Sequence, residues 1–229
     1  MIEPSERDLF RFFDPLADWD VVERALPHWM QDQTVTFITW RTWDSIPADA
    51  AERWRKERNQ WLNQRNLELP ASKRAAEFSS LLKTISPECR KQYYRLFSAR
   101  WESWLDDCHG ECQLRNPELS KIVADSLLFF DNARYLPTDF VVMPNHVHAL
   151  VAFKNRQAIL DQCKSWKHFT AKEINKRLLR KGHFWESDSF DHLVRSEEQW
   201  YWLRRYIRDN PIRAALKSGE YVHYSRELI

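Results

Sequence analysis

Two histidines separated by one residue, His146 and His148, are the side chains of this sequence best placed to do chemistry together. Apolar residues flank them, and a Pro-Asn pair directly before them predicts a turn that opens a strand. Successive side chains of a strand point to opposite faces, so both imidazoles are expected on one face of a sheet. Two neighbouring imidazole nitrogens supply half of a divalent-metal site. A simpler interpretation makes one histidine a turn residue and the other a polar surface residue.

A second polar pair lies near the end of the chain, where Tyr206 and Asn210 are four residues apart. In a helix this spacing puts both side chains on one face. If that helix packs across the face that bears the histidines, Asn210 can add an amide oxygen to the metal site and Tyr206 stands beside it. A phenolate that attacks phosphorus forms a covalent phosphotyrosine, and a metal ion would polarise a phosphate oxygen. Mixed nitrogen and oxygen ligands predict Mn²⁺ or Mg²⁺ as the cofactor.

Several alternatives to these assignments stay open. Tyr206 could be an ordinary tyrosine of an amphipathic helix, followed by a turn-forming Asn-Pro. Tyr201 is a rival nucleophile, although Arg205 occupies the position one turn later where Tyr206 has an amide. His168 and His192 could also reach a metal, but a structural or phosphate-contacting role is the simpler expectation for both.

The composition excludes several other classes of protein. A hydrophobic content of 43% is ample for a packed core, and the 3 glycines do not form a glycine-rich phosphate loop. No apolar run is long enough to span a membrane, and no signal-peptide pattern is present. The 4 cysteines do not make a disulfide framework, which predicts a reduced, cytoplasmic protein. A zinc site at Cys108 and Cys112, with His109 between them, would lack a second ligand pair.

Positive charge gathers in the last third of the chain. Residues 163–229 hold 14 Lys and Arg against 9 Asp and Glu, and the densest basic stretch is 164–181. Such a local excess predicts contacts with the phosphate backbone of a nucleic acid, which weaken steeply as salt rises. The residues expected to make these contacts are Lys164, Lys167, Lys172, Lys176, Arg177, Arg180, Lys181, Arg195, Arg204, Arg205, Arg208 and Arg213.

The elements that must position these side chains follow from periodicity and turn signals. β-Branched and apolar runs predict extended segments at 34–40, 134–143, 146–153 and 184–194. Helical spacing and capping residues predict helices at 48–66, 72–84, 87–106, 117–131, 158–180 and 196–210. The last of these helices is expected to end at Asn210, because Pro211 follows it.

This order of elements predicts an α+β fold with a mostly antiparallel sheet. Residues 1–32 are expected to be an irregular leader with at most a short helix near 19–25. Residues 33–229 would form one domain, interrupted by a helical insertion at 48–107. The tryptophans of that insertion are expected to lie in contacts between its helices.

Several motifs, in order and at similar spacing, resemble the single-tyrosine HUH transposases, and in particular the REP-associated tyrosine transposases. The resemblance covers about residues 34–43 and 108–217. Two positions depart from the family pattern, since Glu186 stands where Gln is common and Phe190 where Tyr is common. The matching motifs are Val-Val-Met-Pro-Asn-His-Val-His at 141–148, Ser-Trp-Lys-x-Phe-Thr at 165–170, Phe-Trp-Glu at 184–186, Phe-Asp-His-x-Val-Arg at 190–195 and Tyr-Ile-Arg-Asp-Asn-Pro-Ile-Arg-Ala at 206–214.

The resemblance implies a ferredoxin-like sheet with helices on its faces. It implies that His146 and His148 are metal ligands, that Asn210 is a third ligand and that Tyr206 is the nucleophile. Members of the family cut single-stranded DNA beside a hairpin, form a 5′-phosphotyrosine and release a 3′-OH. The expected partner is therefore hairpin-bearing single-stranded DNA rather than a membrane, and a homodimer is compatible with the family.

Two other functions remain open. A protein derived from such an enzyme could hold structured single-stranded DNA without cutting it, although the joint presence of Tyr206 and Asn210 with the histidines counts against this. A zinc hydrolase built on the two histidines would lack both a His-Glu-x-x-His pattern and an evident carboxylate base.

Overall fold

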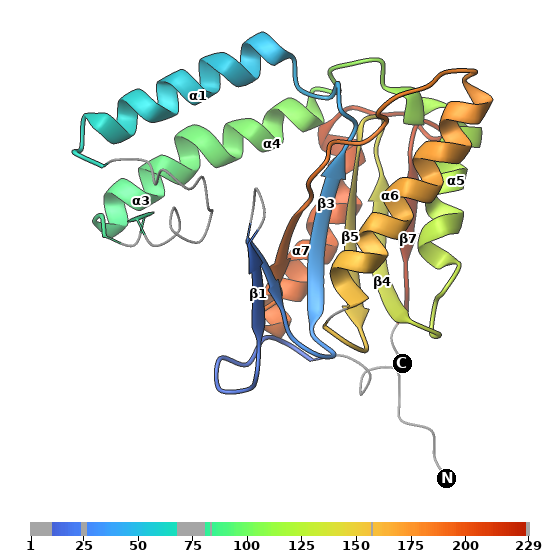
Figure 1. Ribbon diagram of the computed structural model, residues 1–229, viewed down its shortest axis with the longest axis horizontal. Coiled ribbons are helices and arrows are strands. Elements are labelled where there is room, and N and C mark those ends of the chain that lie inside the picture. The colour runs from blue at the N-terminus through green and yellow to red at the C-terminus, as the bar shows by residue number, and fades with distance from the viewer. Residues whose placement is uncertain (1–10, 24–26, 68–80, 83, 157, 228–229) are drawn as a thin grey trace.

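The computed structural model describes residues 11–23, 27–67, 81–82, 84–156 and 158–227. At its centre lies a five-stranded sheet whose neighbouring strands are all antiparallel (Figure 1). The strands lie in the spatial order β6, β3, β5, β4 and β7. They are β3 Val35–Arg41, β4 Tyr135–Val142, β5 His146–Phe153, β6 Phe190–Leu193 and β7 Val222–Ser225.

The first four of these strands have the order of a ferredoxin-like fold. β3 lies between β5 and β6, and β4 borders β5 on the other side. Helix α5 (Pro117–Leu128) precedes β4, and helix α6 (Ala158–Arg177) connects β5 with β6. The predicted α+β class and antiparallel sheet are confirmed. Strand β7 was not predicted, because it is a four-residue edge strand without a buried residue.

Strands β4 and β5 form the predicted hairpin. Val142 lies opposite Val147, and Met143 N donates to His146 O at 2.8 Å across the turn. Every residue of both strands is buried, so the hairpin lies in the interior of the molecule. A strand that is covered on both faces holds its side chains in fixed positions, which suits a site that needs rigid placement.

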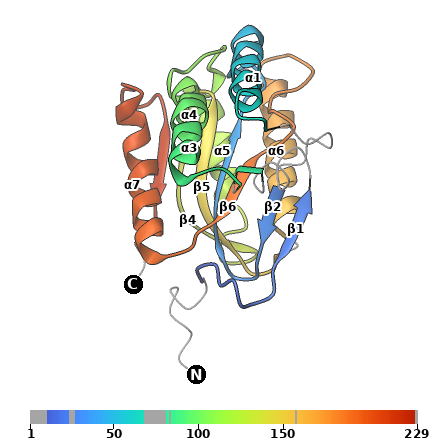
Figure 2. The same cartoon turned by 90° about the vertical axis from the view of Figure 1, so that its left-hand side faces the viewer.

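The two faces of the sheet are covered by different helices (Figure 2). Val147 of β5 packs with Trp166 in the core that α5 and α6 form on one face. Leu150 packs with Ile207 on the opposite face, beneath helix α7 (Glu197–Arg213). Because alternate strand residues point to opposite faces, His146 and His148 lie on the same face as Leu150. This is the face that α7 covers.

Helix α7 begins as predicted but ends later. Ser196 Oγ accepts from Gln199 N at 3.2 Å, which confirms the N-terminal cap. The predicted end at Asn210 is wrong, because Pro211 lies inside the helix, which continues to Arg213. Proline disfavours the helical conformation of the residue before it. Here the side chain of Asn210 is fully buried and its carbonyl accepts from Ala214 N at 3.0 Å, so packing and this bond hold it in the helix.

Three other helices end three residues before their predicted limits. Helix α1 (Ala48–Asn63) stops at Asn63 rather than at 66, α5 stops at Leu128 rather than at 131, and α6 stops at Arg177 rather than at 180. Beyond α6, Leu179 has φ 53°. A residue in this left-handed conformation is a common way to end a helix, although glycine is the usual choice.

The N-terminal region corrects another expectation. Instead of a helix near 19–25, strands β1 (Asp20–Glu23) and β2 (Pro27–Met30) pair antiparallel. The sequence of β1, Asp-Val-Val-Glu, contains two β-branched residues, which favour a strand, and proline is tolerated as the first residue of β2. His28 of β2 forms hydrogen-bonded ion pairs with Asp188 and with Asp191 of β6, which attach this hairpin to the main sheet. Residues 1–10 and 24–26 lie outside the described part of the chain.

The region 48–107 contains helices, as predicted. They are α1 (Ala48–Asn63), α3 (Pro87–Tyr93), the π-helical turn η2 (Tyr94–Ser98) and α4 (Ala99–Asp106). Figure 1 shows α1 and α4 extending side by side away from the sheet. Trp61, Tyr93 and Phe97 are buried against one another, so Trp61 is a core residue of this region. The helix predicted at 72–84 falls mostly outside the described residues, and no helix among those described could cross a membrane.

Candidate active site

The two histidines of β5 lie side by side in the interior. The centroids of the His146 and His148 rings are 4.6 Å apart, and the residues are 0% and 3% exposed. Burial lowers the pKa of His146 to about 3, although the neighbouring Asn210 side chain opposes this. Burial and the proximity of His146 and Arg213 lower the pKa of His148 well below its usual value. Both imidazoles are therefore neutral at physiological pH, which is the form that binds a metal.

The hydrogen bonds of Asn145 fix the tautomer of His146. Asn145 Nδ2 donates to the carbonyl of His109 at 3.1 Å, so its Oδ1 is the acceptor of the 2.7 Å bond with His146 Nδ1. The proton of the His146 ring is then on Nδ1. Consequently, Nε2 presents a lone pair to the interior of the site, as a metal-binding histidine requires.

His148 is held by β3. Its Nδ1 lies 2.7 Å from Thr39 Oγ1, and Thr39 is its cross-strand neighbour. The ring of Phe37 stacks on the imidazole at a centroid distance of 5.5 Å. With Nδ1 engaged by Thr39, the nitrogen of His148 that can bind a metal is Nε2, which faces α7.

Helix α7 brings Tyr206 and Asn210 to this face, as predicted. The hydroxyl oxygen of Tyr206 lies 3.5 Å from His148 Nε2, at the limit of hydrogen-bond distance. The half-buried Tyr206 ring stacks on Trp202 at 5.6 Å, and the guanidinium of Arg213 lies 5.4 Å from its centroid. Tyr201 is 46% exposed and lies five residues earlier, so it points away from the face that bears Tyr206.

Two buried atoms of the site have no hydrogen bond of good geometry, His146 Nε2 and Asn210 Oδ1. Asn210 Nδ2 donates to Asp106 Oδ1 at 3.2 Å, which directs the amide oxygen elsewhere. A buried acceptor without a hydrogen bond lowers the stability of a folded protein by roughly 1–3 kcal/mol. A divalent cation would satisfy both acceptors together with His148 Nε2, so the donor set fits Mn²⁺ or Mg²⁺ with open positions for other ligands.

The described residues contain no group of three or more His, Cys, Asp or Glu side chains that could hold a metal. Cys108 and Cys112 are free thiols, and Cys112 Sγ lies 2.7 Å from the Cys108 carbonyl. A metal at the histidine pair would therefore depend on an amide ligand such as Asn210.

The other two candidate histidines lie in different places. His192 of β6 is the cross-strand neighbour of Phe37, with a ring-centroid distance of 5.3 Å, so it is on the α7 face. Burial and Arg195 lower its pKa to about 4. His168 is an exposed residue of α6 on the opposite face of the sheet, away from the histidine pair.

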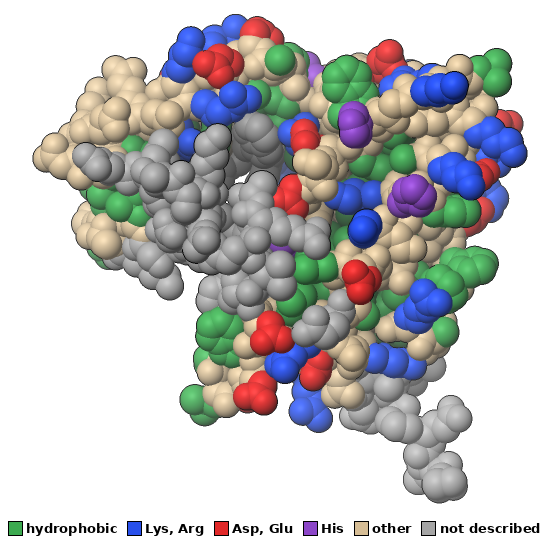
Figure 3. Space-filling view, viewed as in Figure 1, with side chains coloured by type: hydrophobic (Ala, Val, Ile, Leu, Met, Phe, Trp, Pro, Cys, Tyr) green, Lys and Arg blue, Asp and Glu red, His purple; other side chains and the backbone are tan. Residues whose placement is uncertain are grey.

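The basic residues predicted to contact DNA are divided between the two faces. Those from Lys164 to Lys181 belong to α6 and the turn after it, so the sheet separates them from Tyr206. Figure 3 shows Lys and Arg side chains gathered on the α6 side of the molecule. Lys164, Lys172, Lys176 and Lys181 are exposed. Two arginines of this group are paired, Arg177 with Glu173 at 3.1 Å and Arg180 with Glu111 at 2.6 Å.

The arginines of α7 lie near Tyr206 but differ in their surroundings. Arg205 and Arg208 are exposed, and Arg208 pairs with Asp209 at 2.7 Å. Arg213 is 3.1 Å from Asp106. Arg204 instead joins the helix to the sheet. It donates to Asp139, which is 1% exposed, at 3.0 Å and to the Arg226 carbonyl at 2.8 Å.

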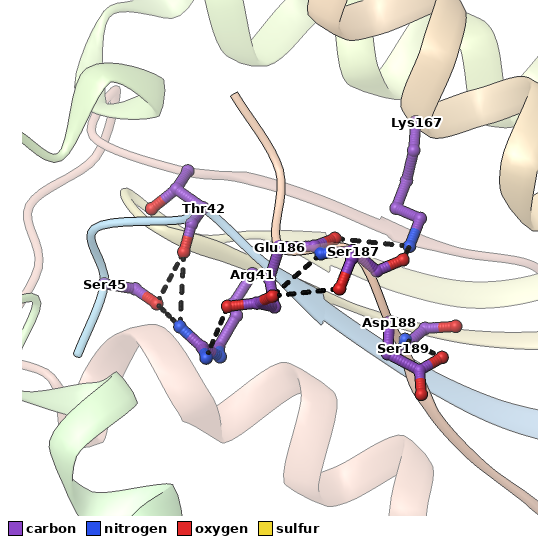
Figure 4. A network of polar contacts seen from close by, with 8 residues as sticks. All are labelled: Arg41, Thr42, Ser45, Lys167, Glu186, Ser187, Asp188 and Ser189. Carbon is purple, nitrogen blue, oxygen red and sulfur yellow. Dashed lines mark hydrogen bonds and ion pairs between the residues drawn. The ribbon is translucent and has the colours of Figure 1, made fainter. Parts of the chain in front are cut away.

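A cavity of about 440 Å³ lies between α6 and residues 182–189, lined in part by Lys164, Lys167 and His168. Figure 4 shows the polar contacts beside it. Lys167 Nζ donates to the Ser187 carbonyl at 2.7 Å, and Glu186 pairs with Arg41 at 2.9 Å. The acid at position 186, where the family commonly has Gln, thus neutralises an arginine that lies opposite His146 in the sheet.

Three residues that shape the site were not predicted. Thr39 holds His148, Asn145 sets the tautomer of His146, and Asp106 orients Asn210. Asn145 directly precedes the histidine, so the sequence could have indicated it as an orienting residue. No sequence signal connects Asp106 with Asn210, because the contact depends on how α4 packs on α7.

A match to one family model supports the predicted resemblance. Residues 132–210 match the family model of IS200-like transposases, a segment that includes both histidines, Tyr206 and Asn210. A solved structure of a REP-associated tyrosine transposase bound to a REP hairpin is remotely similar, with 11% identity and a TM-score of 0.40 over 81% of this chain and 71% of that chain. No curated protein matches the chain.

Proposed function

We propose that this chain, a relative of the IS200-like transposases, cuts and rejoins single-stranded DNA through a covalent bond between Tyr206 and a 5′-phosphate. The main support is the position of the Tyr206 hydroxyl, 3.5 Å from Nε2 of His148. The His148 ring lies next to that of His146, whose Nε2 is buried without a hydrogen bond of good geometry. A structural tyrosine has no need of such neighbours. A nucleophile that attacks a phosphodiester needs them, because an electrophilic centre must be held beside it.

The proposed reaction is a transesterification. The Tyr206 hydroxyl loses its proton, and its oxygen attacks the phosphorus of a DNA phosphodiester. A bond forms between the tyrosine oxygen and phosphorus, while the bond from phosphorus to the 3′-oxygen breaks. The 3′-oxygen leaves with a proton as a free 3′-OH. In the joining step a 3′-OH attacks the phosphotyrosine and releases the phenol, so no external energy source is needed.

In this proposal His146, His148 and Asn210 hold a divalent metal, Mn²⁺ or Mg²⁺. When bound, the metal would withdraw electron density from a phosphate oxygen and orient the phosphodiester. The chain itself supplies the rest of the arrangement. Asn145 and Thr39 hold the imidazoles through Nδ1, and the neutral state of both rings leaves their Nε2 atoms available.

The DNA substrate is proposed to be single-stranded, with a neighbouring hairpin. Exposed Arg205 and Arg208 lie on the same helix as Tyr206, where they can meet the phosphates of the strand that is cut. The lysines of α6 lie across the sheet. If they hold the hairpin, the DNA must pass around an edge of the sheet to reach Tyr206.

The proposal is tested with a labelled hairpin-flanked oligonucleotide, incubated with protein and Mn²⁺ and analysed on a denaturing gel. The wild-type protein is expected to form a covalent adduct and release a shorter strand with a 3′-OH. Tyr206→Phe is expected to form none. Tyr201→Phe is the matched control on the same helix and should form the adduct at the wild-type level. An adduct that persists in Tyr206→Phe would refute the assignment.

The same assay separates the two alternative functions. Tight hairpin binding by the wild-type protein, with no cleavage in Mn²⁺ or Mg²⁺, would favour a non-cleaving DNA-binding protein. Hydrolysis of a small ester or peptide that survives in Tyr206→Phe would favour a hydrolase that uses the histidine pair.

A further inference from the structure

Asp106, the last residue of α4, reaches across to helix α7. Its Oδ1 accepts from Asn210 Nδ2 at 3.2 Å, and its Oδ2 lies 3.1 Å from Arg213. The Asp106 side chain is only 10% exposed, and Asn210 is fully buried. A residue of the helical region 48–107 thus contacts the candidate metal site directly.

The chemistry of this contact determines which way the Asn210 amide faces. An ionised carboxylate accepts hydrogen bonds and cannot donate one. The NH₂ group of Asn210 must therefore face Asp106, and Oδ1 points away from it. The other carboxylate oxygen, Oδ2, lies 3.1 Å from Arg213, so both oxygens of Asp106 face hydrogen-bond donors.

The opposite orientation of the amide would be unsuitable for a metal. With its NH₂ group turned inward, Asn210 would present donors where His146 Nε2 has its lone pair. It would then hydrogen-bond to the histidine and offer the metal no oxygen. In the observed orientation Asn210 Oδ1 is buried and has no hydrogen bond of good geometry.

We infer that Asp106 is a positioning residue, which orients the amide of Asn210 so that its oxygen can bind the metal. This inference rests on the proposed function, because it assumes that Asn210 is a metal ligand. It also gives the helical region 48–107 a role, since this region supplies part of the support of the site. The same carboxylate holds Arg213, whose guanidinium lies near the ring of Tyr206.

The test measures Mn²⁺ binding by calorimetry in a Tyr206→Phe background, where no DNA chemistry occurs. Residues that support metal ligands typically change metal affinity 10–100-fold when mutated. Asp106→Ala is expected to weaken Mn²⁺ binding by about tenfold or more. Asp106→Asn can still accept from Asn210 but also permits the reversed amide, so a smaller loss is expected. The neighbouring Asp107, with a side chain 56% exposed, provides the control Asp107→Ala, which should bind like the parent.

A double-mutant cycle distinguishes positioning from a general loss of structure. If Asp106 acts through Asn210, adding Asp106→Ala to Asn210→Ala should change Mn²⁺ affinity by less than about twofold. A similar loss in both backgrounds would overturn the inference, as would an unchanged affinity in Asp106→Ala alone.

The outcome can be separated from that of the proposed function. Adduct formation by the wild-type protein together with unchanged Mn²⁺ affinity in Asp106→Ala refutes the positioning role and leaves the DNA chemistry standing. If the parent itself does not bind Mn²⁺, the metal site and the role of Asp106 at it are both refuted. If Asp106→Ala fails to fold, the Asp106→Asn variant provides the test instead. An Mn²⁺ affinity of Asp106→Asn equal to that of the parent would then refute the inference.

Discussion

The hydroxyl oxygen of Tyr206 lies 3.5 Å from Nε2 of His148, although the two residues are 58 positions apart in the chain. Strand β5 supplies the imidazole and helix α7 supplies the phenol. Both elements are fixed by the same core, in which Leu150 and Ile207 are fully buried. The distance between nucleophile and candidate ligand therefore follows from the packing of α7 on the sheet.

Trp202 is predicted to contact DNA next to the nucleophile. Its ring stacks on Tyr206 at 5.6 Å while 60% of the residue is exposed, so it presents an aromatic surface beside the site. Stacking of one base on an aromatic side chain contributes roughly 1–3 kcal/mol. Trp202→Ala should weaken binding of a single-stranded oligonucleotide by a corresponding amount in fluorescence anisotropy. Trp43→Ala, at an exposed tryptophan of another segment, is the control, and an equal loss in both variants would contradict the prediction.

Arg204 and Arg205 are adjacent but are predicted to act differently. Arg204→Ala removes the partner of the buried Asp139 and should lower the free energy of unfolding by about 3 kcal/mol in urea titration. Arg205→Ala changes an exposed residue and should alter stability by no more than about 0.5 kcal/mol. It should nevertheless weaken DNA binding. Equal stability of the two variants would show that the pair of Arg204 with Asp139 is not structural.

The lysines of α6 are predicted to bind phosphates. Each phosphate contact contributes about 0.7 to the slope of log K against log salt for single strands, and about 0.9 for duplex DNA. The double variant Lys172→Ala, Lys176→Ala should reduce that slope by about 1.4–1.8 for a hairpin oligonucleotide. Lys121→Ala on α5, whose lysine pairs with Asp125, is the control. An unchanged slope would exclude the α6 surface from the DNA interface.

The hairpin of β1 and β2 is predicted to make stability depend on pH through His28. Burial alone would lower its pKa, but hydrogen bonds and charge interactions with Asp188 and Asp191 raise it to about 9. A raised pKa in the folded state gives stability that is fully present below about pH 6.5 and is lost as the pH rises through about 9. The free energy of unfolding should fall by up to about 3 kcal/mol over this range.

The comparison of wild type with His28→Gln isolates this effect. Urea titrations at pH 6.5 and 9.5 should show that the free energy of unfolding falls more in the wild-type protein than in His28→Gln. If the two proteins lose stability equally between these pH values, His28 is not the group responsible.

The sequence was sufficient to predict what depends on local spacing. The alternation of a strand placed His146 and His148 on one face, and the helical period placed Tyr206 above Asn210. The sequence was not sufficient to predict features that depend on tertiary contacts. Pro211 lies within α7 because Asn210 is held by packing, and the short edge strand β7 exists because β4 offers it an unpaired edge.

The division of the basic residues also could not be read from the sequence. Charge density indicated Lys164 to Lys181 and Arg204 as similar candidates, but α6 and α7 lie on opposite faces of the sheet. Arg204 has a buried acidic partner that lies 65 residues away in the chain. Such contacts are fixed by the arrangement of elements rather than by any one segment.

The central claim is that Tyr206 forms the bond to DNA. Its most direct test is mass spectrometry of the wild-type protein after reaction with a hairpin-flanked oligonucleotide and Mn²⁺, followed by nuclease and trypsin digestion. We predict a 5′-phosphonucleotide attached to the peptide that contains Tyr206, with the modification on that residue. A modification on Tyr201 or another residue, or an unmodified Tyr206 peptide in protein that has cut its DNA, would contradict the claim.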